Sequence, residues 1–158
     1  AVTRPGRLRR VDIDPNSILE ETLGRFRNRA IELGVELEAS LGPAAVVSAD
    51  RSSLERAFGN LVENAIQEMG DGGRLVVSTE REARVGDGVL ATIADTGGGI
   101  DPEMQGRVFE PFVTGKEDGS GLGLAITRRV VLDHGGQIDF ESDVGQGTTF
   151  SVWLPCSA

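Results

Sequence analysis

Glycine divides this chain into short segments. Of its 158 residues 22 are glycine, and most of these lie in clusters. The clusters fall at residues 70–73, 86–88, 97–99, 119–123, 135–136 and 145–147. Glycine favours turns and weakens helices and strands, so each cluster marks a place where an element is expected to end. The chain is therefore expected to fold into helices and strands that end at glycine-rich turns.

Three segments of the chain have apolar residues at helical spacing. The first is predicted to begin with Asp14 as its N-cap and Pro15 in its first turn, and to end at Gly34. The second is predicted from about Asp50 to Met69, with Asp50 or Ser52 as its cap. The third is predicted over about 122–133, ahead of a glycine pair. These are the only long helices that the spacing indicates.

Apolar runs between the helices predict strands. They fall at residues 11–13, 35–39, 46–48, 74–81, 89–94, 137–141 and 148–154. Few of them are joined through a helix, which favours a mainly antiparallel sheet with helices on one face. We therefore predict an α+β, two-layer sandwich over residues 11–158, with residues 95–123 rich in loops. Residues 1–10 are expected to be the remnant of a solvated linker.

Composition excludes several classes of protein. The 25 acidic and 16 basic residues give a net charge of -9, which argues against a nucleic-acid binder. No apolar run approaches the roughly 20 residues that span a bilayer, so no membrane contact is expected. Cys156 and His134 are the only residues of their types. A disulfide framework and a cysteine zinc site are therefore excluded, and a divalent ion would have to be a hard one held by oxygen.

Two asparagines, Asn60 and Asn64, lie four residues apart on the second predicted helix, so they share one face of it. Asparagine is a modest helix former, and two at this spacing call for a reason. One interpretation is a pair of amide oxygens directed at a divalent cation and phosphates. The other is a solvated polar flank, and the pair alone does not decide between them.

Two glycine-rich segments could contact a ligand. Asp95 ends a predicted strand ahead of Gly97 and Gly99, and such a carboxylate can accept a hydrogen bond from an amino group. The alternative is an ordinary acidic turn. Residues 119–123 precede a predicted helix, whose free N–H groups can hold phosphate oxygens. The alternative is a flexible segment that leads into the helix and binds nothing. The latter segment lacks the features of a dinucleotide fingerprint or a P-loop.

Together and in this order, the segments resemble the motifs of the catalytic and ATP-binding domain of sensor histidine kinases. Their superfamily includes DNA gyrase, the mismatch-repair clamp ATPases and a heat-shock chaperone. The resemblance extends from about Val11 to Pro155 and implies a Bergerat-type ATP-binding fold with a short lid. The N box, first glycine box, F box, second glycine box and last glycine box correspond to residues 60–65, 95–100, 109–112, 119–124 and 145–150.

The resemblance implies roles for individual residues. Asn64 would coordinate Mg²⁺, with Asn60 assisting at the phosphates, and Asp95 would accept the adenine amino group. Further contacts to ATP are implied for Gly97, Gly99, Ile100, Phe109, Phe112, Gly119, Gly121, Leu122, Gly123, Leu124 and Thr148. Among these, Gly97 and Gly99 would give the base room, Thr148 would support the adenine edge, and Phe109 and Phe112 would anchor the lid. Lys116, the only lysine, is expected to contact the β- or γ-phosphate.

Three further residues are interpreted through the resemblance. Asn60 occupies the position of the glutamate general base of the superfamily's ATPases, and an amide cannot accept a proton from water, so hydrolysis is expected to be weak. Glu63 lies about 100° from Asn60 around the helix and could not simply replace that base. His134 precedes a glycine stop and is expected to have a structural role at a helix C-terminus, where it is favourably placed against the dipole.

The implied function is protein-histidine kinase activity. This domain would donate the γ-phosphate of ATP to a histidine on a separate, dimerising helical hairpin of the same full-length protein, and a response regulator would receive it next. A serine kinase of the anti-sigma type and a non-catalytic ATP-sensing module are the alternatives. We expect a cytoplasmic, monomeric domain.

Overall fold

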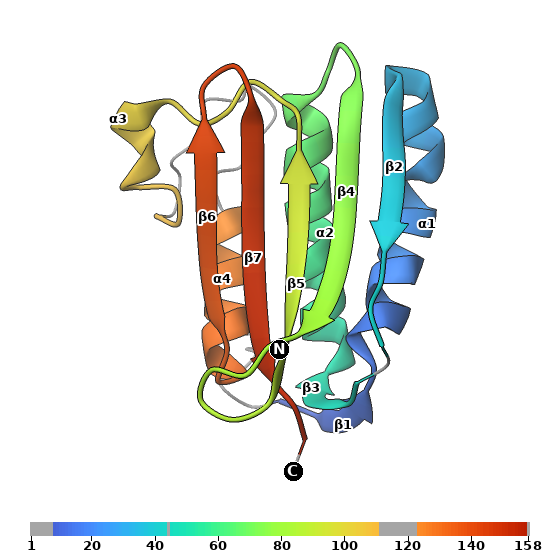
Figure 1. Ribbon diagram of the computed structural model, residues 1–158, viewed down its shortest axis with the longest axis vertical. Coiled ribbons are helices and arrows are strands. Elements are labelled where there is room, and N and C mark those ends of the chain that lie inside the picture. The colour runs from blue at the N-terminus through green and yellow to red at the C-terminus, as the bar shows by residue number, and fades with distance from the viewer. Residues whose placement is uncertain (1–7, 44, 111–122, 158) are drawn as a thin grey trace, which may run out of the picture.

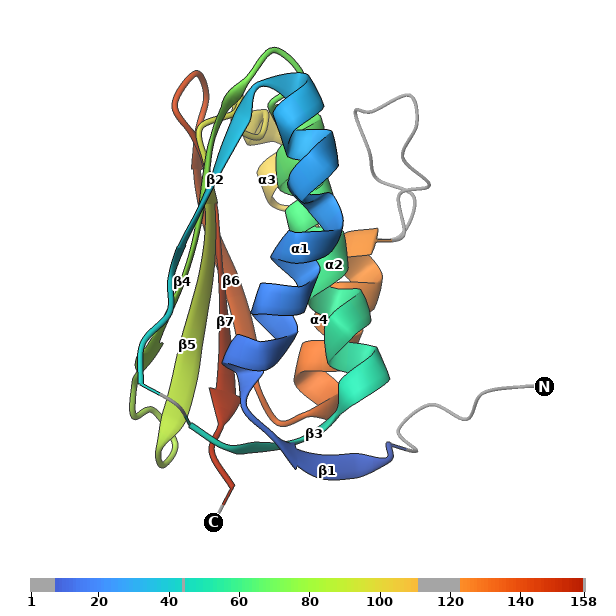
Figure 2. The same ribbon diagram turned by 90° about the vertical axis from the view of Figure 1, so that its right-hand side faces the viewer.

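The structure, a computed structural model, describes residues 8–43, 45–110 and 123–157. They form two layers, a five-stranded sheet and a layer of helices that covers one of its faces (Figures 1 and 2). The elements are β1 (Arg10–Ile13), α1 (Pro15–Leu33), β2 (Val35–Ser40), β3 (Val47–Asp50), α2 (Arg51–Glu68), β4 (Gly73–Arg81), β5 (Gly88–Asp95), α3 (Pro102–Gln105), α4 (Gly123–Asp133), β6 (Gln137–Asp143) and β7 (Gly147–Pro155). The predicted two-layer α+β sandwich is confirmed.

The five-stranded sheet has the order β2-β4-β5-β7-β6. Only β2 and β4 pair in parallel, and the other three pairs are antiparallel. Strands β1 and β3 form a separate antiparallel ribbon at the end of the molecule where the described chain begins. No helix in the described part of the chain is long and apolar enough to cross a membrane.

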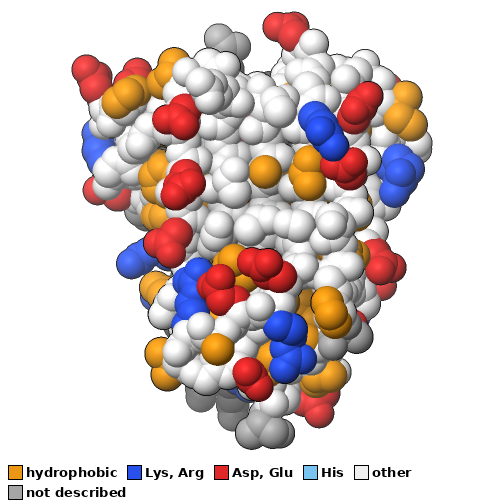
Figure 3. Space-filling view, in the orientation of Figure 1, with side chains coloured by type: hydrophobic (Ala, Val, Ile, Leu, Met, Phe, Trp, Pro, Cys, Tyr) orange, Lys and Arg blue, Asp and Glu red, His pale blue; other side chains and the backbone are white. Residues whose placement is uncertain are grey.

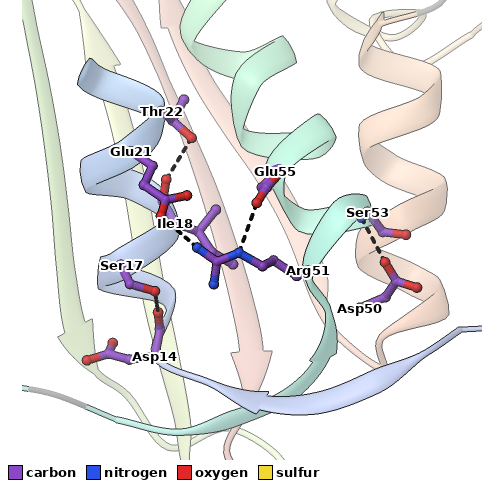
Figure 4. Close-up of polar contacts among 9 residues, drawn as sticks. All are labelled: Asp14, Ser17, Ile18, Glu21, Thr22, Asp50, Arg51, Ser53 and Glu55. Atoms are coloured by element: carbon purple, nitrogen blue, oxygen red, sulfur yellow. Dashed lines mark hydrogen bonds and ion pairs between the residues drawn. The ribbon is translucent and has the colours of Figure 1, made fainter. Parts of the chain in front are cut away.

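The predicted ends of α1 and α2 agree with the structure. The Asp14 side chain accepts a hydrogen bond from the backbone N–H of Asn16, and Gly34 ends α1 in the left-handed conformation, with φ of 72°. Asp50, rather than Ser52, caps α2 and accepts the backbone N–H of Ser53 at 3.0 Å (Figure 4). These local contacts explain why both helices begin where the sequence indicates.

The core lies between the sheet and the helices. One apolar stripe of α2 is fully buried, and so are the inward-facing residues of the strands that it covers. The stripe consists of Leu54, Phe58, Leu61 and Ile66, and the strands contribute Leu75, Val77, Ile93, Phe150 and Val152. The packing fixes α2 on the sheet, so the positions of Asn60 and Asn64 relative to the strands are set by the core.

The other face of the sheet has no helical cover, and Figure 3 shows charged side chains of both signs on it. By strand alternation Trp153 lies on this face, yet it is only 1% exposed. Its indole N–H donates to the Glu82 carbonyl oxygen at 2.7 Å, and a Cβ at Gly88 would overlap its ring. The β4–β5 hairpin therefore covers Trp153.

The start of the described chain is attached to the body of the domain. The Arg9 backbone N–H donates to the Asp50 carboxylate at 2.9 Å. The Arg10 guanidinium donates to the Ser48 carbonyl oxygen at 2.9 Å and to the Asp133 carbonyl oxygen at 3.0 Å. The folded region therefore extends at least to Arg9, two residues before the expected start of the domain.

Candidate functional site

Three polar side chains lie in one row across the end of the sheet. In the strand register Asp95 of β5 is opposite Thr148 of β7, and Thr148 is opposite Ser142 of β6. Asp95 is 7% exposed and Thr148 is 3% exposed. Asp95 continues the inward-facing series of β5, so the row belongs to the helix-covered face. The structure thus brings together the two residues predicted to contact adenine, and adds Ser142.

The loop after Asp95 is held close to α2. The Asp95 carboxylate accepts the backbone N–H of Gly97 at 2.9 Å, which fixes its orientation. A Cβ at Gly97 would lie 2.8 Å from the Glu68 Cβ and 2.9 Å from the Glu68 carbonyl oxygen, in the last turn of α2. Gly97 is therefore required by the packing of the loop on the helix, whether or not it also gives a base room.

The same loop is bound to the β6–β7 turn. The Gly145 N–H donates to the Gly98 carbonyl oxygen at 2.9 Å, and the Ile100 N–H donates to the Ser142 hydroxyl at 2.7 Å. Gly99 has a φ of 78°, and a Cβ there would overlap the Asp143 carbonyl. Two hydrogen bonds and a close backbone approach therefore fix residues 98–100 against the turn.

The asparagine helix α2 packs beside the start of α4. The Asn60 side-chain amide donates to the Gly123 carbonyl oxygen at 3.2 Å. The Thr127 hydroxyl lies 3.3 Å from the Ala57 carbonyl oxygen and 2.9 Å from that of Gly123. Asn64 lies one turn beyond Asn60, partly buried. The first turn of α4, whose N–H groups have no partner within the helix, is thus held beside the predicted phosphate-binding face of α2.

Phe109 is held in an aromatic cluster. Its ring meets Phe140 edge-on at 5.9 Å between centroids and Phe150 at 6.2 Å. Leu124 packs partly buried against the same core. The predicted site residues between these two, Phe112, Lys116, Gly119, Gly121 and Leu122, lie outside the described residues. Phe109 therefore packs on the core, and its role as an anchor of the lid stays a prediction.

Glu63 is directed toward α1. Its carboxylate lies 3.6 Å from the Arg29 guanidinium, and both side chains are nearly half exposed. This ion pair lies on the α1 side of α2, whereas Asn60 contacts α4. The position agrees with the expectation that Glu63 could not simply take over the role of a general base at the Asn60 position.

His134 is buried at a junction of three elements, with 3% exposure. One ring nitrogen, Nε2, accepts the Asp50 backbone N–H at 3.0 Å, so the proton is on Nδ1, which lies 2.8 Å from the Val130 carbonyl oxygen. The structural role at the end of α4 is thus supported. The physical reason differs from the one expected, because a neutral ring that bonds two backbone groups stabilises the junction without a charge–dipole contribution.

Comparison with known proteins identifies the class to which this fold and site belong. The model of the family described as histidine kinase-, DNA gyrase B- and HSP90-like ATPase matches residues 49–158, well over half of the chain. The chain belongs to this family of ATPases.

Within the family, the similar proteins are sensor histidine kinases. The chain is 37% identical over 141 residues to the alginate biosynthesis sensor protein KinB of Pseudomonas aeruginosa, covering 87% of this chain and 23% of KinB. It is 35% identical over 156 residues to the sensor histidine kinase ZraS of Klebsiella oxytoca, covering 98% of this chain and 33% of ZraS. The chain thus spans a quarter to a third of the length of these relatives.

Solved structures of similar proteins have the same fold as this chain. The mycobacterial sensor histidine kinase MprB superposes with a TM-score of 0.82 at 32% identity, over 93% of this chain and 97% of that chain. Full-length ShkA in complex with AMPPNP superposes with a TM-score of 0.85 at 29% identity, over 99% of this chain and 33% of that chain. This chain is therefore a histidine-kinase-type ATP-binding domain.

Proposed function

We propose that this chain is the catalytic part of a sensor histidine kinase, which binds ATP with Mg²⁺ and donates the γ-phosphate to a histidine on a separate helical hairpin of the same protein. A response regulator would receive the phosphate afterwards. The observation that carries the proposal is the pairing of Asp95 with Thr148 at the end of the sheet, beside the helix that bears Asn60 and Asn64.

The base would lie against Asp95 and Thr148. A buried carboxylate oriented by the Gly97 N–H is a hydrogen-bond acceptor suited to the adenine amino group. ShkA, which shares this fold over 99% of the chain, is described with the ATP analogue AMPPNP bound. The phosphates would then extend toward Asn60 and the first turn of α4, where N–H groups favour anions.

Mg²⁺ would be held by Asn64. The residues that the structure describes contain no group of three His, Cys, Asp or Glu side chains that could hold a metal. An amide oxygen is a hard ligand, and Mg²⁺ usually keeps several waters and binds substrate phosphates as well. The bound ion would neutralise charge on the transferring phosphoryl group. Lys116 is proposed to add a positive charge at the β- or γ-phosphate.

Transfer rather than hydrolysis would follow from the residue at position 60. Its amide donates to the Gly123 carbonyl oxygen and cannot take a proton from water, so the bound γ-phosphate would await a nucleophile on another domain. Phosphoryl transfer depends mainly on positioning and charge neutralisation, both of which the proposed site supplies.

Replacement of Asp95 by asparagine tests nucleotide binding. The amide would present a donor to the adenine amino group, so ATP and ADP should both bind at least tenfold more weakly, as expected for loss of a charged hydrogen bond of about 1.5–3 kcal/mol. Calorimetry with and without Mg²⁺ measures this, and removal of Mg²⁺ should weaken ATP binding. Asp139→Asn on the exposed face of β6 is the matched control. Equal ATP affinity in Asp95→Asn and wild type would contradict the adenine site.

A transfer assay tests the reaction. The domain is incubated with labelled ATP, Mg²⁺ and a histidine-bearing helical hairpin. Acid-labile label on the hairpin is the expected result. Acid-stable label on a partner protein would indicate a serine kinase, and binding without any transfer would indicate an ATP-sensing module, so either outcome overturns the proposal.

A further inference from the structure

Ser142 has a place in the site that none of the glycine or asparagine motifs indicates. It lies on β6, opposite Thr148, with its side chain partly buried. Its hydroxyl oxygen has three polar neighbours: the Ile100 N–H at 2.7 Å, the Thr148 hydroxyl at 2.8 Å and the Gly147 carbonyl oxygen at 3.4 Å. Ser142 therefore connects the loop after Asp95 to the residue opposite Asp95.

The Ser142 proton has two possible acceptors. A serine hydroxyl has one proton to donate and can accept two hydrogen bonds. The Ile100 N–H can only donate, so it uses one acceptor position of Ser142. The Ser142 proton can go to Thr148 at 2.8 Å, within the usual O–H···O range, or to Gly147 at 3.4 Å, beyond it. In the first arrangement Thr148 accepts from Ser142, whereas in the second Ser142 accepts from Thr148.

The first arrangement leaves the Thr148 proton available to donate elsewhere. The Thr148 hydroxyl has no other partner among the described residues. Asp95, its neighbour in the row, can only accept when ionised. In this arrangement the row presents an acceptor from Asp95 beside a donor from Thr148. A 6-amino purine offers the complementary pair, an amino donor and the N1 acceptor, whereas a 6-oxo purine offers the reverse.

We propose that Ser142 is a positioning residue that orients the Thr148 hydroxyl as a donor and so contributes to the selection of adenine over 6-oxo purines. The proposal rests on the proposed function, because it needs a purine against Asp95 and Thr148. Ser142 itself acts through Thr148 and the Ile100 N–H, and need not touch the base.

The test compares ATP with inosine triphosphate, which has a 6-oxo group and an N1 proton but no 2-amino group. Dissociation constants are measured by calorimetry for the 158-residue chain and its variants. Ser142→Ala leaves the Thr148 hydroxyl free to rotate. The ratio of ATP to inosine triphosphate affinity should fall about fivefold, the factor that corresponds to one neutral hydrogen bond of about 1 kcal/mol.

Three variants separate positioning from a structural effect. Ser142→Thr keeps the hydroxyl and should keep the wild-type ratio. Ser142→Cys keeps the size but has a weak hydrogen-bonding group, and should lower the ratio even if Ser142→Ala folds poorly. Ser151→Ala removes a β7 hydroxyl from the helix-free face and should leave the ratio unchanged. In a Thr148→Val background, Ser142→Ala should cause no further fall, because its effect passes through Thr148.

The proposal is overturned if Ser142→Ala and Ser142→Cys keep the wild-type ratio while both variants bind ATP. It is also overturned if Ser142→Ala lowers the ratio by the same factor with and without the Thr148 hydroxyl. Failure of the proposed function has a different signature: wild-type protein that binds no ATP, or an Asp95→Asn variant with undiminished affinity.

Discussion

Replacement of Asp50 by alanine should loosen the junction of β1, α2 and α4. The carboxylate accepts the Ser53 N–H at 3.0 Å, which caps α2, and the Arg9 N–H at 2.9 Å, which attaches the start of the described chain (Figure 4 shows the first of these). The backbone N–H of Asp50 donates to His134 at the end of α4. One residue therefore joins all three elements, and α2 carries both asparagines of the proposed site.

The size of the effect follows from the two bonds that the carboxylate makes. Loss of an N-cap costs about 1 kcal/mol, and loss of a second hydrogen bond costs about 1 kcal/mol more. The free energy of unfolding should fall by about 2 kcal/mol, which for a domain of this size lowers Tm by about 4–8 °C. Asp50→Asn can still cap α2 with its amide oxygen and should cost about half as much.

The cost should depend on pH. The N–H of Arg9 and then that of Ser53 hold the pKa of Asp50 below its ordinary value, because both stabilise the ionised carboxylate. A group whose pKa is lower in the folded state stabilises the protein above its unfolded pKa of about 3.9, and the stabilisation is lost as the pH falls through the folded value. The difference between wild type and Asp50→Asn should therefore be largest near neutral pH and shrink below about pH 4.

Urea unfolding at a series of pH values measures these differences. Glu36→Gln is the matched control, since Glu36 is exposed on β2 and the structure gives it no hydrogen bond or ion pair among the described residues. A cost for Asp50→Asn that stays constant from pH 7 to pH 3 would refute the assignment of these bonds to the ionised carboxylate. So would an Asp50→Ala protein as stable as wild type at pH 7.

Two further predictions concern buried packing and buried hydrogen bonds. His134→Ala leaves the Asp50 N–H and the Val130 carbonyl oxygen without their ring partner, so it should lower the free energy of unfolding by about 2–4 kcal/mol. The ATP affinity of the folded protein should not change. Unaltered stability with lost ATP affinity would show a catalytic histidine instead. Gly88→Ala forces a Cβ into the Trp153 ring, so it should lower the free energy of unfolding by about 1–3 kcal/mol and shift the fluorescence emission of this single tryptophan to the red. Gly24→Ala is the control, because a Cβ there meets nothing within 4 Å, and it should raise the free energy of unfolding by about 0.5–1 kcal/mol. A Gly88→Ala protein as stable as Gly24→Ala would contradict the packing of the hairpin on Trp153.

Local signals in the sequence predicted most of the elements. The sequence marks both ends of α1 locally, with Asp14 and Pro15 at its start and Gly34 at its end. The structure has Asp14 as the N-cap and Gly34 as the C-cap. Asp101 with Pro102 has the same signature, yet α3 was not predicted. Its helical segment ends within four residues at Gln105, too short for an apolar repeat to be visible. A capping signal alone therefore does not distinguish a helix from a single turn.

Pairing between distant strands could not be predicted in the same way. The ribbon of β1 with β3 and the parallel pairing of β2 with β4 depend on which edges meet after the helices have packed, and no local pattern specifies that. The same limit applies to the site. Asp95 stands in a recognisable segment, whereas Ser142 gains its place only because the register sets it opposite Thr148.

The glycines of the first glycine box show why polar residues give the more informative tests of function. Gly97 is required by its approach to Glu68, and Gly99 by its positive φ and its approach to Asp143. A substitution at either position would disturb the loop even if no nucleotide ever bound, so lost activity there would not identify a ligand. Asp95 and Ser142 can be changed to residues of similar size that alter only which atoms donate and accept. A change in the preference among purines, at unchanged stability, then reports on the donors and acceptors that the site offers to the base, whether the altered residue touches the base or acts through Thr148.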